Sequence, residues 1–422
     1  MQDPALFLRT LFDRAVEVAD PMQSLAAHLP PKPEGRLIVV GAGKASARMA
    51  EAVEDVYGSC EGLVITRYGY ARPCKGIEIV EAAHPVPDAA GEMATKRMLE
   101  LLAECGEDDM VLALISGGGS ALLTAPAADI SLAEKQALTD DLLASGAPIG
   151  DINGIRKQIS AVKGGKLAAA AYPARMLALM ISDVPGDNPG DIASGPTVGD
   201  TGDAKRALSL LERWNVTPPA SIAQFLAAGG APLAPDDPHL SRVENVIYAA
   251  PAQSLEAAAE IARANGFEVR NLGDALEGEA RDVAQHHAAL ALDIQNGLTH
   301  SDAPILLLSG GELTVTRRGQ GVGGPNAEYA LAMALALQGA DGIDAIACDT
   351  DGVDGAAEVA GALIGPDTLA KAKSKTVDAQ LALFENDAHG FFASLGDQVV
   401  PGPTLTNVND FRACLIQPKG AS

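Results

Sequence analysis

The feature that most constrains the fold of this chain is a recurring order of short apolar run, glycine-rich turn and helix-compatible stretch. Its first example is Arg36–Val40 (RLIVV), which leads directly into GAGKASARMAEAVEDVYG. A fully apolar run of this length is typical of a strand that is covered on both faces. Since strand, glycine turn and helix together open a doubly wound unit, the pattern predicts an α/β fold with mainly parallel sheets.

The same alternation continues through the first half of the chain and starts again in the second half. Further short strands are predicted at residues 63–66, 77–80, 111–115, 177–181, 245–249, 267–271, 305–308, 343–348 and 414–417. Residues 215–240 instead become rich in Pro, Ala and Gly, which marks a domain boundary. We therefore expect an N-terminal doubly wound α/β domain over residues 1–240 and a C-terminal α/β domain over residues 241–422. The leading helix, within residues 1–30, is able to pack on the other domain.

The segment Ala303–Leu337 carries the densest set of signals in the second half. A buried strand at Ile305–Leu308 is followed by a second short strand at Glu312–Thr316 and by a loop, Arg317–Gly324, that contains four glycines. A helix is expected to start near Asn326 as its N-cap. Accessible loop amides beside a helix N-terminus would form an anion site, although the glycines could equally serve only the turn.

Composition limits the classes of function that are open to the chain. Its 422 residues, 47% of them hydrophobic, are enough for two domains with separate cores. A formal net charge of −24 disfavours nucleic-acid and anionic-membrane binding, and no stretch reaches the roughly 20 apolar residues that span a bilayer. Five scattered cysteines without a CxxC pair fit a reducing cytoplasm. An anionic small-molecule substrate remains compatible with local cations, and so does a homodimer.

Gly41–Ser46 (GAGKAS) ends the first predicted strand and matches a dinucleotide-binding turn only in part. Ser46 stands at the third glycine position, and the next strand ends in Thr66 followed by an arginine rather than in an acid. The spacing of a Walker loop is absent as well. A lysine at a glycine turn that opens a helix nevertheless suits a phosphate or carboxylate, so Gly43 and Lys44 are candidate site residues.

A second glycine motif, SGGGS, follows the buried strand VLALI. Three successive glycines at the carboxyl end of a strand allow backbone amides to approach a ligand closely, and the serines add hydroxyl groups. A nucleophile elbow is excluded because Leu122 stands where its last glycine belongs. The candidate ligand-binding residues here are Ser116, Gly117, Gly118, Gly119 and Ser120.

Two aspartates follow buried strands at their carboxyl ends, where ligands bind in open α/β sheets. Asp183 leads into a Gly- and Pro-rich loop that contains Asn188, and Asp351 lies in DTDGVDG together with Asp354. Such acids could hold Mg²⁺ or accept a proton from a substrate hydroxyl, although Asx-turns use the same residue types. The second loop does not match an EF-hand, because its acids do not fall at the required positions.

Basic residues gather in one segment of this acidic chain. Arg156, Lys157, Lys163 and Lys166 fall within eleven residues, which indicates either a local anion pocket or a solvated helix face. The adjacent pair His286–His287 cannot share one face of a helix. No histidine metal site or histidine triad is therefore predicted.

Taken together, these motifs resemble the class II glycerate kinases, the glycerate 2-kinase family whose C-terminal region is called MOFRL and whose members are sometimes labelled hydroxypyruvate reductases. The resemblance covers nearly the whole chain. It is carried in order by GAGKA (41–45), HPVPD (84–88), ISGGGSALL (115–123), INGIRKQISAVKGGKLA (152–168), SDVPGD and IASGPTVGD (182–200), LSGGE (308–312), DTDGVDG (349–355), and NDAHGFF and TNVNDF (386–411).

The resemblance implies two α/β domains with the active site in the cleft between them, and a MOFRL region over about residues 303–417. It also implies ATP-dependent phosphorylation of D-glycerate, usually to 2-phosphoglycerate. With the motifs above, we expect ATP and Mg²⁺ as cofactors, Lys44, Asp183 and Asp351 as catalytic residues, and Asp183, Asp351 and Asp354 as metal ligands. The expected substrate- and phosphate-binding residues are Gly43, Ser116, Gly117, Gly118, Gly119, Ser120, Arg156, Lys163, Asn188, Glu312, Arg318, Gly323, Gly324 and Asn326.

One departure from the family pattern affects the glycine loop. Family members commonly carry arginines in GRGGRN, whereas this chain reads GVGGPN at Gly321–Asn326. Either Arg317 or Arg318 compensates, or the substrate preference differs. Two alternatives to the kinase stay open. One is an NAD(P)H-dependent hydroxypyruvate reductase, in which Arg67 would meet a 2′-phosphate, and the other is a noncatalytic hydroxy-acid-binding relative.

Overall fold

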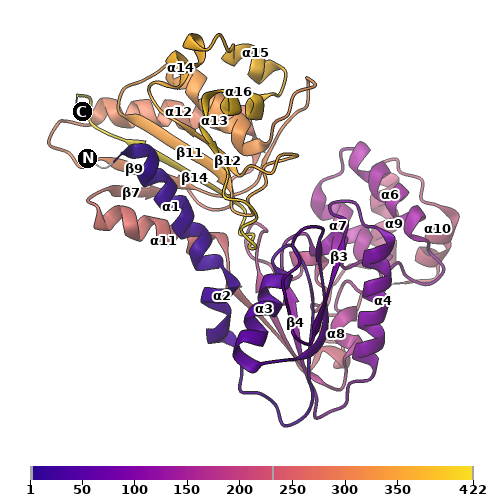
Figure 1. Cartoon of the computed structure of the whole chain (residues 1–422). Coiled ribbons are helices and arrows are strands. Elements are labelled where there is room, and N and C mark those ends of the chain that lie inside the picture. Colours follow the sequence, from indigo (N-terminus) through magenta and orange to yellow (C-terminus); the bar gives the residue numbers. More distant parts are fainter. Residues whose placement is uncertain (1–2, 231, 421–422) are drawn as a thin grey trace. The chain divides into compact units, whose positions relative to one another are not determined.

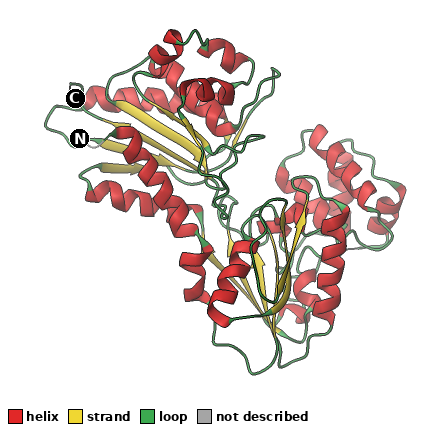
Figure 2. Ribbon diagram, in the orientation of Figure 1, coloured by secondary structure: helices red, strands yellow, loops and turns green. Residues whose placement is uncertain are grey.

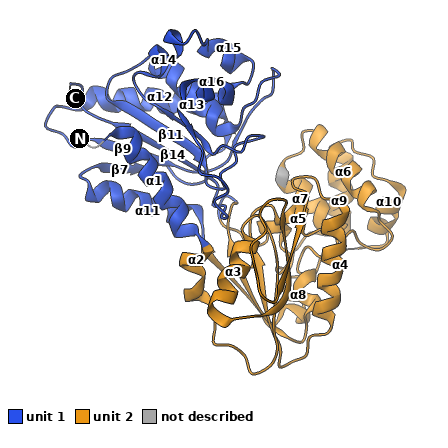
Figure 3. Ribbon diagram, in the orientation of Figure 1, with its two compact units in different colours: residues 1–20, 184–186, 249–422 blue, residues 21–183, 187–248 orange. Residues whose placement is uncertain are grey.

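The computed structural model describes residues 3–230 and 232–420. The chain forms two compact units, each assembled from separate stretches of sequence (Figure 3). Unit 1 contains Met1–Asp20, Val184–Gly186 and Ala249–Ser422, and unit 2 contains Pro21–Asp183 and Asp187–Tyr248. Each unit combines a sheet with helices, so the predicted α/β class is confirmed (Figure 2).

Unit 2 alternates strands and helices in its first part and is mainly helical in its second. Its elements are α2 (Pro21–Ser24), η1 (Leu25–His28), β1 (Leu37–Ala42), α3 (Ser46–Tyr57), β2 (Glu61–Arg67), β3 (Ile77–Ala82), α4 (Ala89–Ala103), β4 (Met110–Ile115), α5 (Gly119–Leu122), α6 (Leu132–Ala144), α7 (Ile149–Gln158), α8 (Lys166–Ala170), β5 (Arg175–Ile181), η2 (Ile192–Ser194), α9 (Ala204–Arg213), α10 (Ala220–Ala227), η3 (Pro238–Leu240) and β6 (Val243–Ala249).

The sheet of unit 2 has the order β3-β2-β1-β4-β5-β6. The pairs β1–β2, β1–β4, β2–β3 and β4–β5 are all parallel, as the apolar strand pattern predicts. The strand order turns back between β1 and β4, because the chain runs outward from β1 to β3 and then returns to β1's other side. In open sheets of this kind, ligands bind beyond the carboxyl ends of the strands at such a switch point.

A separate core in unit 2 lies among helices. The helices α6, α7, α9 and α10 enclose the buried side chains of Leu138, Ile155, Leu211 and Ile222. The first of these helices starts with a capping box, in which Ser131 and an N3 glutamate exchange hydrogen bonds. This helical group holds α7 in place, and α7 carries Arg156.

Unit 1 contains the first helix and the second half of the chain. Its elements are α1 (Pro4–Ala19), α11 (Pro251–Ala264), β7 (Glu268–Asn271), β8 (Gly278–Glu279), α12 (Ala280–Gly297), β9 (Ile305–Ser309), β10 (Leu313–Thr314), α13 (Pro325–Leu337), β11 (Ile343–Asp349), β12 (Gly361–Ile364), α14 (Thr368–Ser374), α15 (Ala379–Phe384), α16 (Ala388–Leu395), β13 (Gln398–Val399) and β14 (Asp410–Ile416).

The main sheet of unit 1 is mixed, with the order β13-β12-β11-β14-β9-β7. Only β7 and β9 pair in parallel, and the pairs β9–β14, β14–β11, β11–β12 and β12–β13 are antiparallel. The expectation of a mainly parallel sheet is therefore wrong for this unit. The physical reason is that β14 returns between β9 and β11, and a strand buried on both faces has the same apolar pattern in either direction.

Helices cover both faces of this sheet (Figure 1). On one face, α12, α13 and α16 build a core that includes Met333 and Phe392. On the other face, α1 and α11 pack over the sheet, and the rings of Phe12 and Phe411 lie 6.0 Å apart between centroids. Helix α1 is thus an integral part of the core of unit 1.

Two further properties of the described residues bear on the chain's chemistry. None of their helices combines the length and the apolar character that crossing a membrane requires. All five cysteines carry free thiols, and four of them are buried.

Candidate functional site

The switch point of unit 2 brings two predicted glycine motifs side by side. β1 and β4 are neighbours in the sheet, so the Gly43–Lys44 turn and the Ser116–Ser120 turn emerge next to each other. The backbone N–H of Lys44 donates to the carbonyl of Gly117 at 2.8 Å. The two turns therefore form one continuous stretch of backbone beyond the sheet edge.

Close packing explains why glycine stands at two positions in these turns. Gly43 has a φ of +150°, and a Cβ atom on it would lie 2.0 Å from the Ser116 hydroxyl oxygen. Gly118 has a φ of +80°, and its Cβ would lie 3.1 Å from the His84 ring and 3.1 Å from the Lys44 Cγ. Lys44, Gly118 and His84 thus converge at one point.

His84 is a site residue that sequence reasoning missed. It follows β3 in the segment HPVPD, which the parallel order β3-β2-β1 carries to the same edge of the sheet. No second histidine lies near it in the sequence. The only available signal was that HPVPD is among the motifs that carry the family resemblance.

The Ser120 end of the turn contacts a backbone segment in an unusual conformation. The Ser120 and Ser194 hydroxyl oxygens lie 2.7 Å apart, and the Ser194 hydroxyl also donates to Asn153 Oδ1 at 3.5 Å. Ala193 and Ser194 have φ values of +52° and +62°. Consecutive residues other than glycine rarely adopt such values, and they concentrate at functional sites.

Two predicted cations lie beside this end of the turn. Arg156 Nη2 donates to the Ser120 carbonyl at 3.3 Å, while its Nε is buried without a hydrogen-bond partner. Lys163 has no exposed surface, and its Nζ donates to the Ala193 carbonyl at 3.2 Å. Burial, together with the charges of nearby lysines and arginine, holds the pKa of Lys163 well below its ordinary value.

A third buried cation, Lys135, was not predicted, because it stands outside the run of basic residues at 156–166. It is 2% exposed, and its Nζ donates to the Thr124 hydroxyl at 2.6 Å. Burial is the largest cause that lowers its pKa to about 7, and the charge of Arg156 adds to the effect. Three cations thus share one buried region of unit 2.

The Asp183 loop contains one half-buried candidate and one exposed candidate. Asp183 lies two residues beyond the end of β5, and the parallel β4–β5 pairing places it at the same sheet edge as the glycine turns. Asn188 is exposed. Its Oδ1 accepts from the Gly190 N–H at 3.1 Å and its Nδ2 donates to Asp191 at 2.7 Å. Both polar groups of Asn188 are therefore engaged within its own turn.

In unit 1, the carboxylate of Asp354 lies at the N-terminus of helix α13, where the sequence predicts an anion-binding site. Its two carboxylate oxygens accept from the backbone N–H groups of Asn326 at 3.0 Å and Ala327 at 2.8 Å. Helix α13 starts at Pro325 with Gly324 as N-cap, so Asn326 is the second helical residue and the expectation that it caps the helix is wrong. Both carboxylate oxygens of Asp354 are therefore used to cap this helix.

The glycine loop at 317–324 also uses its amides internally, which contradicts the expectation that they stay accessible. The N–H groups of Arg318 and Gly319 donate to Asn386 Oδ1 at 2.7 and 2.9 Å, and that of Gly321 donates to the Glu385 carbonyl at 2.9 Å. A Cβ on Gly323 would lie 2.7 Å from the Asn386 carbonyl oxygen. The loop is thus hydrogen-bonded to residues 385–386, which precede α16.

The remaining candidates of unit 1 differ in exposure. Arg318 and Glu312 are exposed, whereas Asp351 is 1% exposed and its Oδ1 accepts from the Val353 N–H at 2.8 Å. Val322, which stands at an arginine position of the family pattern, is 52% exposed. Among the residues described, no group of three or more His, Cys, Asp or Glu side chains is arranged to hold a metal ion.

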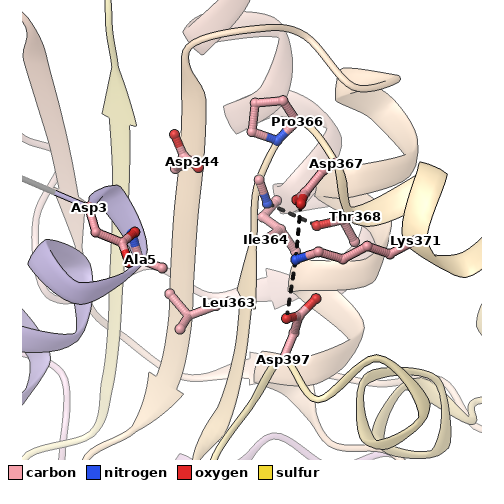
Figure 4. A pocket seen from close by; sticks show the side chains of 11 residues that line it. Asp3, Ala5, Asp344, Leu363, Ile364, Pro366, Asp367, Thr368, Lys371 and Asp397 are labelled. Atoms are coloured by element: carbon pink, nitrogen blue, oxygen red, sulfur yellow. Dashed lines mark hydrogen bonds and ion pairs between the residues drawn. The ribbon is translucent and has the colours of Figure 1, made fainter. Parts of the chain in front are cut away.

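One pocket of unit 1 lies apart from every predicted site residue (Figure 4). It has a volume of about 490 Å³ and is lined by Asp3, Asp344, Asp367, Asp397 and Lys371, among others. Lys371 Nζ lies 3.1 Å from Asp367 Oδ2 and 3.6 Å from Asp397 Oδ1. Four carboxylates around one ammonium repel anions, so this pocket does not suit an anionic substrate.

Comparison with known proteins gives family matches over both halves of the chain. Residues 7–227 match a family described as a domain of unknown function, DUF4147. Residues 305–410 match the MOFRL family. The two matches include the glycine turns of unit 2 and the glycine loop of unit 1.

Similar proteins match over almost their whole length. A D-glycerate 2-kinase from Thermotoga maritima is 37% identical over 406 residues, which is 96% of each chain. A protein from Agrobacterium vitis, provisionally named a hydroxypyruvate reductase, is 46% identical over 97% of this chain and 94% of its own. The crystal structure of a glycerate kinase from Thermotoga maritima matches with a TM-score of 0.87 at 34% identity, covering 98% of this chain and 99% of that chain.

Proposed function

We propose that this chain, which belongs to the glycerate 2-kinase family with a C-terminal MOFRL region, transfers the terminal phosphoryl group of ATP to D-glycerate. The expected product is 2-phosphoglycerate. The observation that carries the proposal is the convergence of Lys44 with two glycine turns at the switch point of unit 2.

This arrangement suits phosphoryl transfer because that reaction needs positioning and charge stabilisation more than it needs a covalent nucleophile. Backbone amides at the Ser116–Ser120 turn would hold oxygen atoms of the transferring group or of the substrate. The ammonium group of Lys44 would stabilise the negative charge that spreads over the phosphoryl oxygens. Asp183, at the same sheet edge, would accept the proton of the attacking hydroxyl or orient it.

Mg²⁺ belongs to this proposal as a partner of the nucleotide. Mg²⁺ commonly binds through substrate phosphates, waters and only one or two carboxylates, so a complete cage of protein ligands is not required. Asp183 is the carboxylate of unit 2 that we propose for it. In unit 1, Asp351 stays a prediction, and Asp354 is left out because both of its carboxylate oxygens cap α13. When bound, the ion would neutralise charge on the phosphates.

A hydroxypyruvate reductase is the second candidate, because it is the provisional name of the relative from Agrobacterium vitis. The structure offers it little support at the glycine turn. Ser46 replaces the third glycine of a dinucleotide turn, and its hydroxyl donates to the Leu114 carbonyl at 2.9 Å from a fully buried position. The kinase is therefore preferred.

The test follows both reactions with one protein preparation. ADP formation from MgATP and D-glycerate is measured in parallel with NADPH oxidation on hydroxypyruvate. We expect ADP formation only, its loss in EDTA and its return with Mg²⁺. We expect Lys44→Met to lower kcat by about a hundredfold or more without changing the melting temperature. Lys96→Met, which removes an exposed ammonium of α4, should leave kcat unchanged. NADPH oxidation without ADP formation would reverse the assignment.

A further inference from the structure

The buried cations of unit 2 lack the counter-charges that buried cations ordinarily have. Within the described part of the chain, neither Lys135, Lys163 nor Arg156 forms an ion pair with a carboxylate, and each donates only to a carbonyl or a hydroxyl oxygen. Lys157 differs, since it lies 2.7 Å from Asp200 and 3.6 Å from Asp191. The lack of a carboxylate partner is therefore specific to Lys135, Lys163 and Arg156 and is not shared by every cation nearby.

Burying these three cations together lowers the stability of the folded protein. An unpaired buried charge loses its hydration without gaining a Coulombic partner, so buried cations are found next to carboxylates or ligands. Here Arg156 acts on both lysines as a like charge, which raises the cost further. A fold that keeps three cations together in this way gains if an anion is bound at times, because that anion offsets the repulsion.

We propose that Arg156, with Lys163 and Lys135 buried behind it, is the subsite that receives the carboxylate of the substrate. This inference rests on the proposed function, because it takes the substrate to be a hydroxy acid. Arg156 is the half-buried member, so it is the one that would touch the carboxylate. Lys163 and Lys135 are positioning residues that act through their charge and through the Ala193 and Thr124 oxygens that they hold.

The location of the three cations favours a carboxylate over a phosphate. Lys44 faces Gly118, while Arg156 holds the carbonyl of Ser120. Residues two apart have Cα atoms within about 7.6 Å of each other. A 2-hydroxy acid carries its acceptor hydroxyl and its carboxylate on adjacent carbons. One short turn can therefore direct the hydroxyl toward the phosphoryl group at Lys44 and the carboxylate toward Arg156.

We also expect a proton to be taken up when the carboxylate binds to this subsite. The charged groups that face Lys163 are Lys135 from α6 and Arg156 and Lys157 from α7, all of them cationic. Those that face Lys135 are Arg156 and, from α4, Glu92. An arriving anion raises the pKa of both lysines, so protons are taken up as the carboxylate binds.

The experiment measures binding without turnover. Isothermal titration calorimetry is run with D-glycerate, glycerol and inorganic phosphate, each with and without a non-hydrolysable ATP analogue. We expect Lys163→Met and Lys135→Met to weaken D-glycerate binding about tenfold or more while leaving the ATP analogue within about twofold. The matched control Lys205→Met removes an exposed ammonium from α9 and should change neither. In Tris and in PIPES, the wild type should show net proton uptake that falls in Lys163→Met.

Thermal unfolding separates this role from a structural one. Lys163→Met replaces a buried amine that has no carboxylate partner with an apolar side chain, so the ligand-free variant should melt at a higher temperature than the wild type, and D-glycerate should stabilise it less. A lower melting temperature with unchanged affinity for D-glycerate would make Lys163 a structural residue and overturn the proposal.

The remaining outcomes are equally decisive. Weaker binding of phosphate or of the ATP analogue, with D-glycerate unaffected, would assign the cluster to the nucleotide and overturn the carboxylate assignment. A wild type that binds no D-glycerate under either condition would also overturn it. If the wild type binds D-glycerate in a Lys163-dependent manner but forms no ADP, the proposed kinase function fails while the carboxylate subsite stands.

Discussion

At the scale of single residues, Gly118 is the position of the candidate site where an added side chain would meet both Lys44 and His84. Its φ of +80° and its contacts with His84 and Lys44 are separate reasons for glycine, one concerning the backbone and the other the space for a side chain. Backbone strain alone costs about 1 kcal/mol for alanine, and the crowding acts directly on Lys44. Substitutions can separate the two effects, because other glycines of unit 2 share only the first.

We predict that Gly118→Ala lowers kcat/KM about tenfold or more, because the added methyl group displaces Lys44 or His84. Gly146→Ala is the matched control, since Gly146 has a φ of +75° and nothing within 4 Å of the added atom. Both variants should lose similar stability in urea, and only the first should lose activity. Equal activity of the two would show that the contact with Lys44 is unimportant.

Asp344 gives a prediction for the pH dependence of stability. Burial, followed by the charges of Asp367, Asp3 and Asp341, raises its pKa to about 6. Between about pH 4 and pH 6 the folded protein thus binds a proton that the unfolded chain has released, so the free energy of unfolding falls as the pH rises through this window. Asp344→Asn should remove that fall.

The measurement compares urea unfolding at pH 4.5 and pH 7. Because Asp344 is partly exposed, we expect Asp344→Asn to stabilise the protein by only about 1 kcal/mol at pH 7, with little effect at pH 4.5. Asp236→Asn, an exposed substitution in unit 2, should change neither value. A variant less stable than the wild type at pH 7 would contradict the assigned pKa shift.

At the scale of elements, the local sequence pattern predicts features that depend on neighbouring residues. It does not predict contacts between residues that are distant in the sequence. The Gly43–Lys44 and Ser116–Ser120 turns could be found because each follows a fully apolar strand, and parallel pairing then brings them together. Asp354 capping α13 could not be found, because its partners lie 28 and 27 residues away. The direction of β14 is hidden for the same reason.

Asp354→Asn tests the capping of α13. An asparagine can accept from only one of the two backbone N–H groups, so we expect a loss of about 1–3 kcal/mol and faster hydrogen exchange at residues 326–330. Asp367→Asn is the control, because Asp367 is the N-cap residue of α14 but its side chain accepts no capping hydrogen bond and is 64% exposed. Unchanged exchange at the start of α13 would refute the capping role.

At the scale of the whole molecule, the two units are not successive segments of sequence. Helix α1 lies in the core of unit 1, where Ser254 donates to the Ala15 carbonyl at 2.7 Å and Thr406 donates to the Ala19 carbonyl at 2.8 Å. The residues of unit 2 fall between α1 and these partners in the sequence. The stability of unit 1 therefore depends on a helix at the opposite end of the chain.

We predict that Phe12→Ala destabilises unit 1 selectively, by about 3–5 kcal/mol, because Phe12 is fully buried against Phe411. Hydrogen exchange should accelerate in β11 and β14 and remain unchanged in β1 and β4. Leu6→Ala, on the same helix but 55% exposed, should have little effect on either set of strands. Equal acceleration in both units would show that they unfold together.

The position of α1 also sets an order of events on the ribosome. Thr406 follows Ala19 by 387 residues, so the apolar face of α1 emerges long before the strands that cover it. The residues of unit 2 can fold around their own cores before the partners of α1 have been synthesised. The nascent chain thus carries an uncovered amphipathic helix through most of its synthesis, which makes α1 the segment that chaperones are expected to hold. A message truncated before β14 would leave the facing edges of β9 and β11 unpaired and Phe12 without Phe411, and such a chain would be prone to aggregate.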